Sequence, residues 1–170
     1  YVYSNGLIFV MSQSVALITG AAKRLGANTA ARLHQQGYTV VIHCHHSVEQ
    51  ANRHALRLNQ IRDNSAFVIQ ADLSDIGKIN ALSEYISKEF SRLDVLINNA
   101  SSFYPTPLSS LTPDQYHDLI ATNMTAPLFL TKACTQLLKI ANGIVINMCD
   151  IHAARPLEQH SAYCMAKAGQ

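Results

Sequence analysis

The sequence lacks several features that would assign it to a special class of protein. It has no tryptophan, and only 14% of its 170 residues are charged, with a formal net charge of +2. So small a net charge does not favour a nucleic acid or an acidic membrane surface as a partner. No apolar run approaches the roughly 20 residues that a membrane-spanning helix needs. With 48% hydrophobic residues, the composition is that of one soluble globular domain.

The cysteines form neither a metal-binding pattern nor a disulfide framework. Cys44, Cys134, Cys149 and Cys164 show no C-x-x-C spacing, and four are too few for a disulfide-rich scaffold. We therefore expect four buried, inert thiols in a cytoplasmic protein.

Both ends of the sequence look artificial. Residues 1–10 precede Met11, which reads like a natural start, and they have neither the basic region nor the cleavage site of a signal peptide. We expect residues 1–11 to be a non-native leader and residues 12–170 to form the structured domain. Gln170 ends the chain inside an apparent helix, which indicates a truncated reading frame.

Short apolar runs alternate with helical patterns along the chain. Runs typical of buried parallel strands occupy residues 15–19, 39–43, 66–70, 94–98 and 143–147. Helical patterns occupy residues 26–36, 48–59 and 74–91, and Thr112 with Pro113 opens a long further helix. This alternation predicts an α/β fold: a Rossmann-type doubly wound parallel sheet in three layers, incomplete at its C-terminal end.

The turn after the first strand has the composition of a phosphate-binding loop. Gly20 and Gly26 allow a tight turn and close approach of a pyrophosphate, and the following helix offers free N–H groups. Lys23, Arg24 and Leu25 lie between the two glycines. The segment reads T-G-x-x-x-R-x-G rather than G-x-G-x-x-G, so its position after the first strand carries the prediction of a dinucleotide site.

Histidines follow the second strand, at the position where a carboxylate would select NAD. A carboxylate there binds the ribose 2′-hydroxyl and repels a 2′-phosphate. His43, His45, His46 and Ser47 can instead donate to that phosphate, which predicts NADP(H) as the cofactor. Two alternatives stay open: a metal site, for which no third ligand is evident, and exposed histidines without a role.

The third and fourth strands also end in residues suited to a cofactor. Asp72, followed by Leu73, either holds the adenine amino group or caps the next helix. Asn99, Ala100 and Ser101 follow the fourth strand, and small residues there allow the backbone to approach a cofactor closely.

Two features farther along the chain need an explanation. Phe103 and Tyr104 either stack on a flat ligand or pack beneath a loop. Asn123 lies inside the long predicted helix, where asparagine is unfavourable. A side-chain hydrogen bond or a functional placement is therefore expected for Asn123.

The run Y-C-M-A-K is the most informative chemical motif. Tyr163 and Lys167 are four residues apart and share one helix face, so both can reach one ligand. A phenol, with a pKa of about 10, needs a nearby cation before it becomes a useful acid or base at neutral pH. Lys167 is placed to supply that cation, which predicts a general acid/base pair for carbonyl or imine reduction. Asp150 lies thirteen residues before the tyrosine.

In order and spacing, these motifs resemble the short-chain dehydrogenase/reductase family. The glycine turn, the D-L pair, the N-N-A run, Asn123 and the Y-x-x-x-K pattern all match it. The resemblance covers residues 15–170. It implies a Rossmann-type fold, a nicotinamide cofactor, and a catalytic group of Asn123, Asp150, Tyr163 and Lys167.

Two departures from the general family look like its pteridine reductase branch. Asp150 stands where most members have serine, and Arg24 stands where most have glycine; the run from Asn99 to Pro107 is also similar. The resemblance implies that the aspartate and the tyrosine deliver protons to pterin ring nitrogens.

The same resemblance implies a substrate site beside the cofactor. Phe103 is expected to stack on the pterin, on the side away from the nicotinamide. Arg24 and Ser101 are expected to contact cofactor phosphate and pterin. His46 stands where the branch often has an arginine at the 2′-phosphate.

We therefore expect an NADPH-dependent pteridine reductase that acts on a dihydropterin such as dihydrobiopterin or dihydromonapterin, with dihydrofolate as a further candidate. Tyr163 is the expected proton donor, and Lys167 its electrostatic partner and ribose ligand. Asp150 is the expected second acid or relay, or else a structural carboxylate that accepts from backbone N–H groups. Asn123 is expected to order a water between Lys167 and solvent.

Two other functions stay open. One is a carbonyl reductase of the same family, acting on a 3-oxoacyl thioester or a sugar ketone. The other is a dinucleotide-binding protein without turnover. The resemblance implies a homo-tetramer for the full-length protein. The 170-residue chain alone is expected to aggregate and to be inactive, because its sheet edge would be unpaired.

Overall fold

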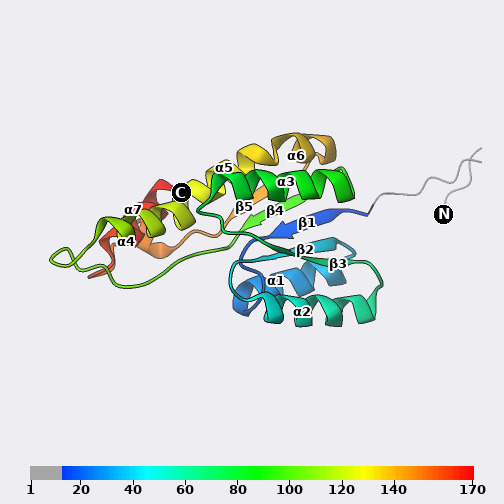
Figure 1. The fold of residues 1–170 in the computed structure, drawn as a ribbon, viewed down its shortest axis with the longest axis horizontal. Coiled ribbons are helices and arrows are strands. Elements are labelled where there is room, and N and C mark those ends of the chain that lie inside the picture. The colour runs from blue at the N-terminus through cyan, green and yellow to red at the C-terminus, as the bar shows by residue number, and fades with distance from the viewer. Residues whose placement is uncertain (1–12) are drawn as a thin grey trace, which may run out of the picture.

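Five parallel strands form the centre of the structure, in the order β3-β2-β1-β4-β5 (Figure 1). The computed structural model describes residues 13–170, and the predicted leader lies outside them. The strands are β1 (Val15–Ile18), β2 (Thr39–Cys44), β3 (Ala66–Gln70), β4 (Val95–Asn98) and β5 (Ile144–Asn147). All five predicted strands are confirmed. The strand order reverses between β1 and β4: β2 and β3 lie to one side of β1, and β4 and β5 lie to the other. In such sheets, ligands bind at this point, beyond the carboxyl ends of the strands.

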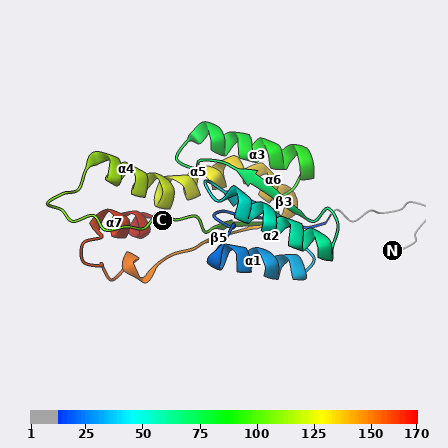
Figure 2. The same cartoon turned by 60° about the horizontal axis from the view of Figure 1, so that its bottom comes forward.

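Helices cover both faces of the sheet (Figure 1). They are α1 (Arg24–Gln35), α2 (Val48–Ile61), α3 (Ile76–Phe90), α4 (Pro113–Ile120), α5 (Ala126–Ala133), α6 (Thr135–Ala141) and α7 (Ser161–Gly169). α1 and α2 lie on one face, and α3, α5 and α6 lie on the other. α4 and α7 lie side by side at the end away from the N-terminus, in both views (Figures 1 and 2). The predicted three-layer α/β fold is confirmed.

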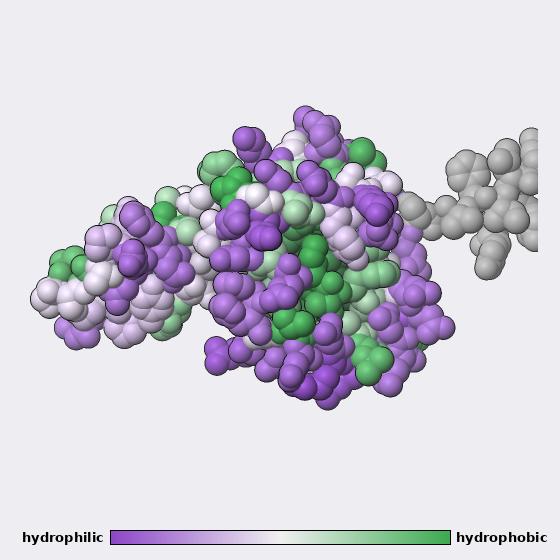
Figure 3. Space-filling model, in the orientation of Figure 1, coloured by the Kyte–Doolittle hydropathy of each residue, from purple (hydrophilic) through white to green (hydrophobic). Residues whose placement is uncertain are grey.

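The core is divided in two by the sheet. Neighbouring residues of a strand point to opposite faces, so Leu17 packs with α3 and α5 while Ala16 and Ile18 pack with α1 and α2. Figure 3 shows an apolar area between the two helical layers, where β2 and β3 lie in Figure 1. At the other edge, β5 is exposed along its whole length. In the described part of the chain, no helix has the length and apolar character to cross a membrane.

The predicted helices differ from the observed ones in their boundaries: those predicted at residues 26–36 and 48–59 are Arg24–Gln35 and Val48–Ile61. The helix predicted from Ser74 begins at Ile76, because Asp75 caps it by accepting from the N–H groups of Gly77 and Lys78. The long helix begins as predicted, with Pro113 at its first position and Thr112 as the N-cap, which forms a capping box with Gln115. It is then interrupted by a π-helix at Ala121–Thr125 and by a further break between α5 and α6.

The prediction of four buried thiols is only partly right. Cys44, Cys134 and Cys164 are buried, and burial raises the pKa of the Cys134 thiol to about 11. Cys149 is exposed, because it lies in the loop that follows β5. All four cysteines are free thiols.

Candidate active site

A cleft of about 620 Å³ opens beyond the carboxyl ends of β1, β2, β3 and β4. It brings together the residues that the sequence assigned to the cofactor from four separate turns. Those that line it are Gly20, Lys23, Arg24, Leu25, Gly26, His43, His45, His46, Ser47, Asp72, Leu73, Asn99, Ala100 and Ser101.

The glycine turn leaves no room for side chains on the side facing β4. Gly20 has φ +62°, and a Cβ there would lie 2.9 Å from the Cα of Ala100. A Cβ on Gly26 would lie 2.6 Å from both the Asn99 Nδ2 and the Gly20 oxygen. Asn99 Nδ2 donates to the carbonyl oxygens of Thr19 and Gly20, at 2.8 and 3.3 Å, and so holds the turn. No side chain caps α1, so its first N–H groups are available to an anion such as a pyrophosphate.

Gly26→Ala is expected to destabilise the protein by roughly 1–3 kcal/mol, as overpacking of a close contact does. The new methyl group would push Asn99 and the glycine turn apart, so affinity for NADPH should fall as well. Urea unfolding and NADPH titration measure the two effects. Gly77→Ala is the matched control, because its Cβ would meet only the Asp75 side chain, at 3.1 Å. Wild-type stability and NADPH affinity in Gly26→Ala would contradict the close fit.

Arg24 occupies a backbone conformation that favours glycine. Its φ is +55°, in the left-handed region, which costs an L-residue about 1–2 kcal/mol. Its side chain is exposed at the cleft. Backbone strain of this kind is common at functional sites, and Arg24 lies at the cleft.

His43 has a different role from the predicted one. It is 2% exposed; its Nδ1 accepts from the N–H of Gly20 at 3.2 Å, and its Nε2 donates to the carbonyl oxygen of Ala71 at 3.0 Å. Both ring nitrogens are therefore used, which leaves no donor for a 2′-phosphate. Burial lowers the pKa of His43 to about 4, so the ring is neutral at physiological pH.

The buried His43 predicts acid sensitivity. Its pKa of about 4 lies below the value of about 6.5 in an unfolded chain, so the unfolded state binds more protons between these values. Folding stability should therefore fall by roughly 3 kcal/mol as pH falls from 6.5 to 4. Urea unfolding across this range checks the loss, which should become smaller in His43→Asn and persist in His117→Asn, a variant of an exposed histidine. An unchanged slope in His43→Asn would contradict this origin.

His45, His46 and Asp72 form a polar group at the cleft rim. The two imidazole rings stack with centroids 3.6 Å apart, and His45 Nε2 lies 3.8 Å from Asp72 Oδ2. Asp72 Oδ1 accepts from the N–H and the hydroxyl of Ser74, and these bonds lower the pKa of Asp72. The capping alternative for Asp72 is wrong, because Asp75 caps α3. Among residues 13–170, no three His, Cys, Asp or Glu side chains form a metal-binding group.

Asp150 and Tyr163 are joined directly. The Tyr163 hydroxyl donates to Asp150 Oδ2 at 2.7 Å, while Asp150 Oδ1 accepts from the N–H of His152 at 2.9 Å. The carboxylate thus accepts from a backbone N–H group, as expected of a structural carboxylate. It also contacts Tyr163, as expected of a second acid or relay. The His152 N–H, and then the Tyr163 hydroxyl, lower the pKa of Asp150. Burial, and then the hydrogen bond and charge of Asp150, raise the pKa of Tyr163, so its phenol is protonated.

Lys167 was predicted to lower the pKa of the Tyr163 phenol, but it is not among the groups that shift this pKa. Its Nζ donates to the Met148 carbonyl oxygen at 2.9 Å and to Gln170 Oε1 at 2.7 Å. The lysine lies on α7 with Tyr163, but its ammonium group is directed to the loop after β5. Burial lowers the pKa of Lys167, and its charge contributes to lowering the pKa of Asp150.

Asn123 lies in the π-helix and is fully buried. Its Oδ1 accepts from the Ser101 hydroxyl at 2.6 Å, and its Nδ2 donates to the carbonyl oxygens of Ser102 and Leu119, at 2.9 and 3.0 Å. These bonds explain an asparagine inside a helix, because they fix the loop after β4. The sequence held a signal for the π-helix: Pro127 has no N–H to donate to the carbonyl of Asn123, four residues earlier.

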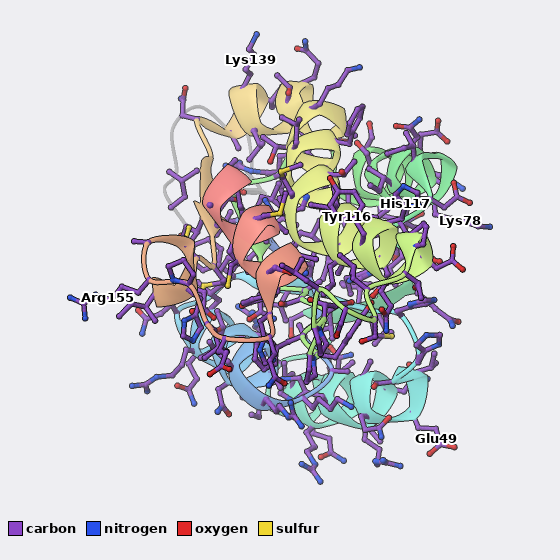
Figure 4. The ribbon with its side chains drawn as sticks, turned by 90° about the vertical axis from the view of Figure 1, so that its left-hand side faces the viewer. Glu49, Lys78, Tyr116, His117, Lys139 and Arg155 are labelled. Carbon is purple, nitrogen blue, oxygen red and sulfur yellow. The ribbon has the colours of Figure 1, made fainter. Side chains whose placement is uncertain are left out.

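Phe103 stands beside Tyr163. Its ring is 55% exposed and meets the Tyr163 ring edge-on, with centroids 4.8 Å apart. The His160 ring stacks on Phe103, at 4.7 Å and 14°. Sequence reasoning missed His160, because only the fold brings the residue before α7 to the loop after β4. Figure 4 shows this end of the molecule, with α4 and α7 towards the viewer and Arg155 pointing outwards.

The doubly wound sheet, the glycine turn and the cleft define a nucleotide-binding protein of the Rossmann class. The chain belongs to the short chain dehydrogenase family, whose model matches residues 14–170. It is 38% identical to pteridine reductase 1 of Leishmania tarentolae, over 90% of this chain and 66% of that protein.

More distant relatives carry other names. The chain is 28% identical to galactitol 2-dehydrogenase of Agrobacterium fabrum, over 93% of this chain and 60% of the relative. It is 29% identical to a 3-oxoacyl-[acyl-carrier-protein] reductase of Staphylococcus aureus, over 91% of this chain and 63% of the relative. The chain therefore spans less than two thirds of the length of these relatives.

Proposed function

We propose that the protein is an NADPH-dependent pteridine reductase that transfers hydride to a dihydropterin, such as dihydrobiopterin or dihydromonapterin, with dihydrofolate as a further candidate. The observation that carries the proposal is the 2.7 Å bond between Tyr163 and Asp150, with Phe103 beside the tyrosine. A ketone reductase has no need of this carboxylate, whereas a pterin offers it an N–C–N edge. The 38% identity to a pteridine reductase supports the same choice.

The chain provides a fitting site for NADPH. The pyrophosphate would lie on the glycine turn, against the uncapped start of α1, where Gly20 and Gly26 leave the necessary space. His45, His46 and Ser47 would hold the 2′-phosphate, and Asp72 the adenine end. Bound NADPH supplies the hydride.

A second group of residues, Phe103, Asp150 and Tyr163, would bind the pterin and move protons; Tyr163 interacts with Ser101, which lines the cleft. The exposed face of Phe103 offers a stacking surface for a flat ring. The phenol of Tyr163 is protonated, so it has a proton to donate to a ring nitrogen, although its raised pKa makes it a weaker acid than an ordinary phenol. The lowered pKa of Asp150 favours a proton acceptor or relay over a second acid.

Lys167 and Asn123 would support these groups. Lys167, held by the Met148 carbonyl, would bind the nicotinamide ribose. Asn123 fixes the loop that carries Ser101 and Phe103, and we propose that it also orders a water between Lys167 and solvent.

NADPH consumption by the full-length protein tests the proposal, with 7,8-dihydrobiopterin and acetoacetyl-CoA as parallel substrates. Oxidation with the pterin alone is expected. Oxidation with the thioester alone would assign the protein to the carbonyl reductases, as two of the relatives would suggest. NADPH binding without oxidation of any substrate would favour a dinucleotide-binding protein without turnover. A homo-tetramer and a cytoplasmic location remain predictions.

A further inference from the structure

Two exposed histidines stack on one another at the rim of the cleft. The His45 and His46 rings have centroids 3.6 Å apart and an interplanar angle of 28°. Both lie in the short connection between β2 and α2 and line the cleft. Two rings so placed present their edges together to a ligand in the cleft.

The charged groups around this pair come from two other segments. Asp72, after β3, lies 3.8 Å from His45 Nε2 and interacts electrostatically with both rings. Lys23 and Arg24, in the β1–α1 turn, line the same cleft and add positive charge.

The remaining neighbours add little charge to the pair. Glu49, in the first turn of α2, pairs with Arg53 at 3.5 Å. His43 is buried and neutral, with both of its nitrogens used. Gln70 Nε2 donates to the His45 carbonyl oxygen, which fixes the backbone of the pair. Asp72 therefore supplies a single anion beside two imidazoles, which leaves room for a second anion next to the pair.

We propose that the His45–His46 pair takes up a proton when it binds the 2′-phosphate of NADPH, so that the preference for NADPH over NADH falls as pH rises. This inference rests on the proposed NADPH dependence and goes beyond it. The connection from Cys44 to Val48 contains no lysine or arginine, so its charge depends on imidazoles, which ordinarily titrate between pH 5 and 8.

The sign of the effect follows from linkage. A phosphate monoester carries close to two negative charges above about pH 7, and it binds a charged donor more strongly than a neutral one. The complex then holds more protons than its separate components. Affinity for the 2′-phosphate should fall by up to about tenfold per pH unit above neutrality, if one full proton is taken up. Affinity for NADH should not change, because NADH has no such group.

Calorimetry with 2′,5′-ADP and 5′-AMP tests the proposal without any turnover. Each ligand is titrated into the full-length protein at pH 7.5, in buffers that differ in ionisation enthalpy. We expect uptake of up to one proton with 2′,5′-ADP and none with 5′-AMP. Binding of 2′,5′-ADP without proton uptake would overturn the inference and leave the NADPH assignment intact. No binding of either 2′,5′-ADP or NADPH at any pH would overturn both.

His46→Arg supplies a permanent charge and is the sharpest variant. It should bind 2′,5′-ADP equally well at pH 7 and pH 8.5, with little proton uptake, because arginine stays charged. His117→Arg is the matched control, an exposed histidine on α4 (Figure 4), and should keep the wild-type pH dependence. Wild-type proton uptake in both His46→Arg and His45→Arg would contradict the proposal.

Discussion

Tyr163→Phe is expected to lower kcat for pterin reduction about a thousandfold, within the range that a positioned acid contributes. The substitution removes the hydroxyl that donates to Asp150 at 2.7 Å, and it retains the ring that meets Phe103 edge-on. The buried side chain keeps its shape, so the fold should be retained. NADPH affinity should change less than threefold, a difference of under about 0.7 kcal/mol.

Steady-state kinetics measure the loss of kcat in Tyr163→Phe, and NADPH titration measures its affinity for the cofactor. Tyr116→Phe is the matched control, because the Tyr116 ring meets His117 on α4 and not Phe103 (Figure 4). It should have close to wild-type kcat. A loss of less than tenfold in Tyr163→Phe would show that another group donates the proton.

Asp150→Ser is expected to lower kcat for pterin reduction about a hundredfold, with little change in NADPH affinity. The variant loses the carboxylate that would accept from the N–C–N edge of a pterin. Serine can still accept from the His152 N–H, since it is a favourable capping residue, so the loop after β5 should keep its structure.

The same substitution at another capping aspartate provides the control. Asp75→Ser at the start of α3 should retain capping and leave kcat unchanged, because, among residues 13–170, the Asp75 side chain accepts only from the N–H groups of Gly77 and Lys78 and has no bond to Tyr163. Equal losses of kcat and NADPH affinity in Asp150→Ser would reduce Asp150 to a structural role. Both variants can be compared by pterin-dependent NADPH oxidation and by NADPH titration.

The fold was predictable because its three central strands, β1, β2 and β4, are buried on both faces. Each strand reads as a short apolar run, and each ends in a turn of distinctive composition, such as the Gly20 turn or the histidines after β2. Parallel strands bring these turns to one edge of the sheet. Residues far apart in sequence, such as Gly26 and Asn99, could therefore be assigned to one cleft before the structure was known.

Side-chain partners were less predictable, because they depend on distances that a sequence does not contain. The alternation of strand residues does not reveal that both nitrogens of His43 bond to backbone groups. The spacing of Tyr163 and Lys167 correctly placed them on one helix, yet Lys167 bonds to the Met148 carbonyl. The stacking of His160 on Phe103 likewise joins two loops separated in the chain.

Isotope transfer from the cofactor tests the central claim most directly. The full-length protein is given NADPH carrying deuterium at the transferable C4 position, together with 7,8-dihydrobiopterin, and the product is examined by mass spectrometry. We expect a tetrahydropterin with one deuterium on carbon, and none of this product from Tyr163→Phe in the same time. A protein that binds the labelled cofactor but forms no deuterated pterin, while it reduces acetoacetyl-CoA, would contradict the assignment as a pteridine reductase.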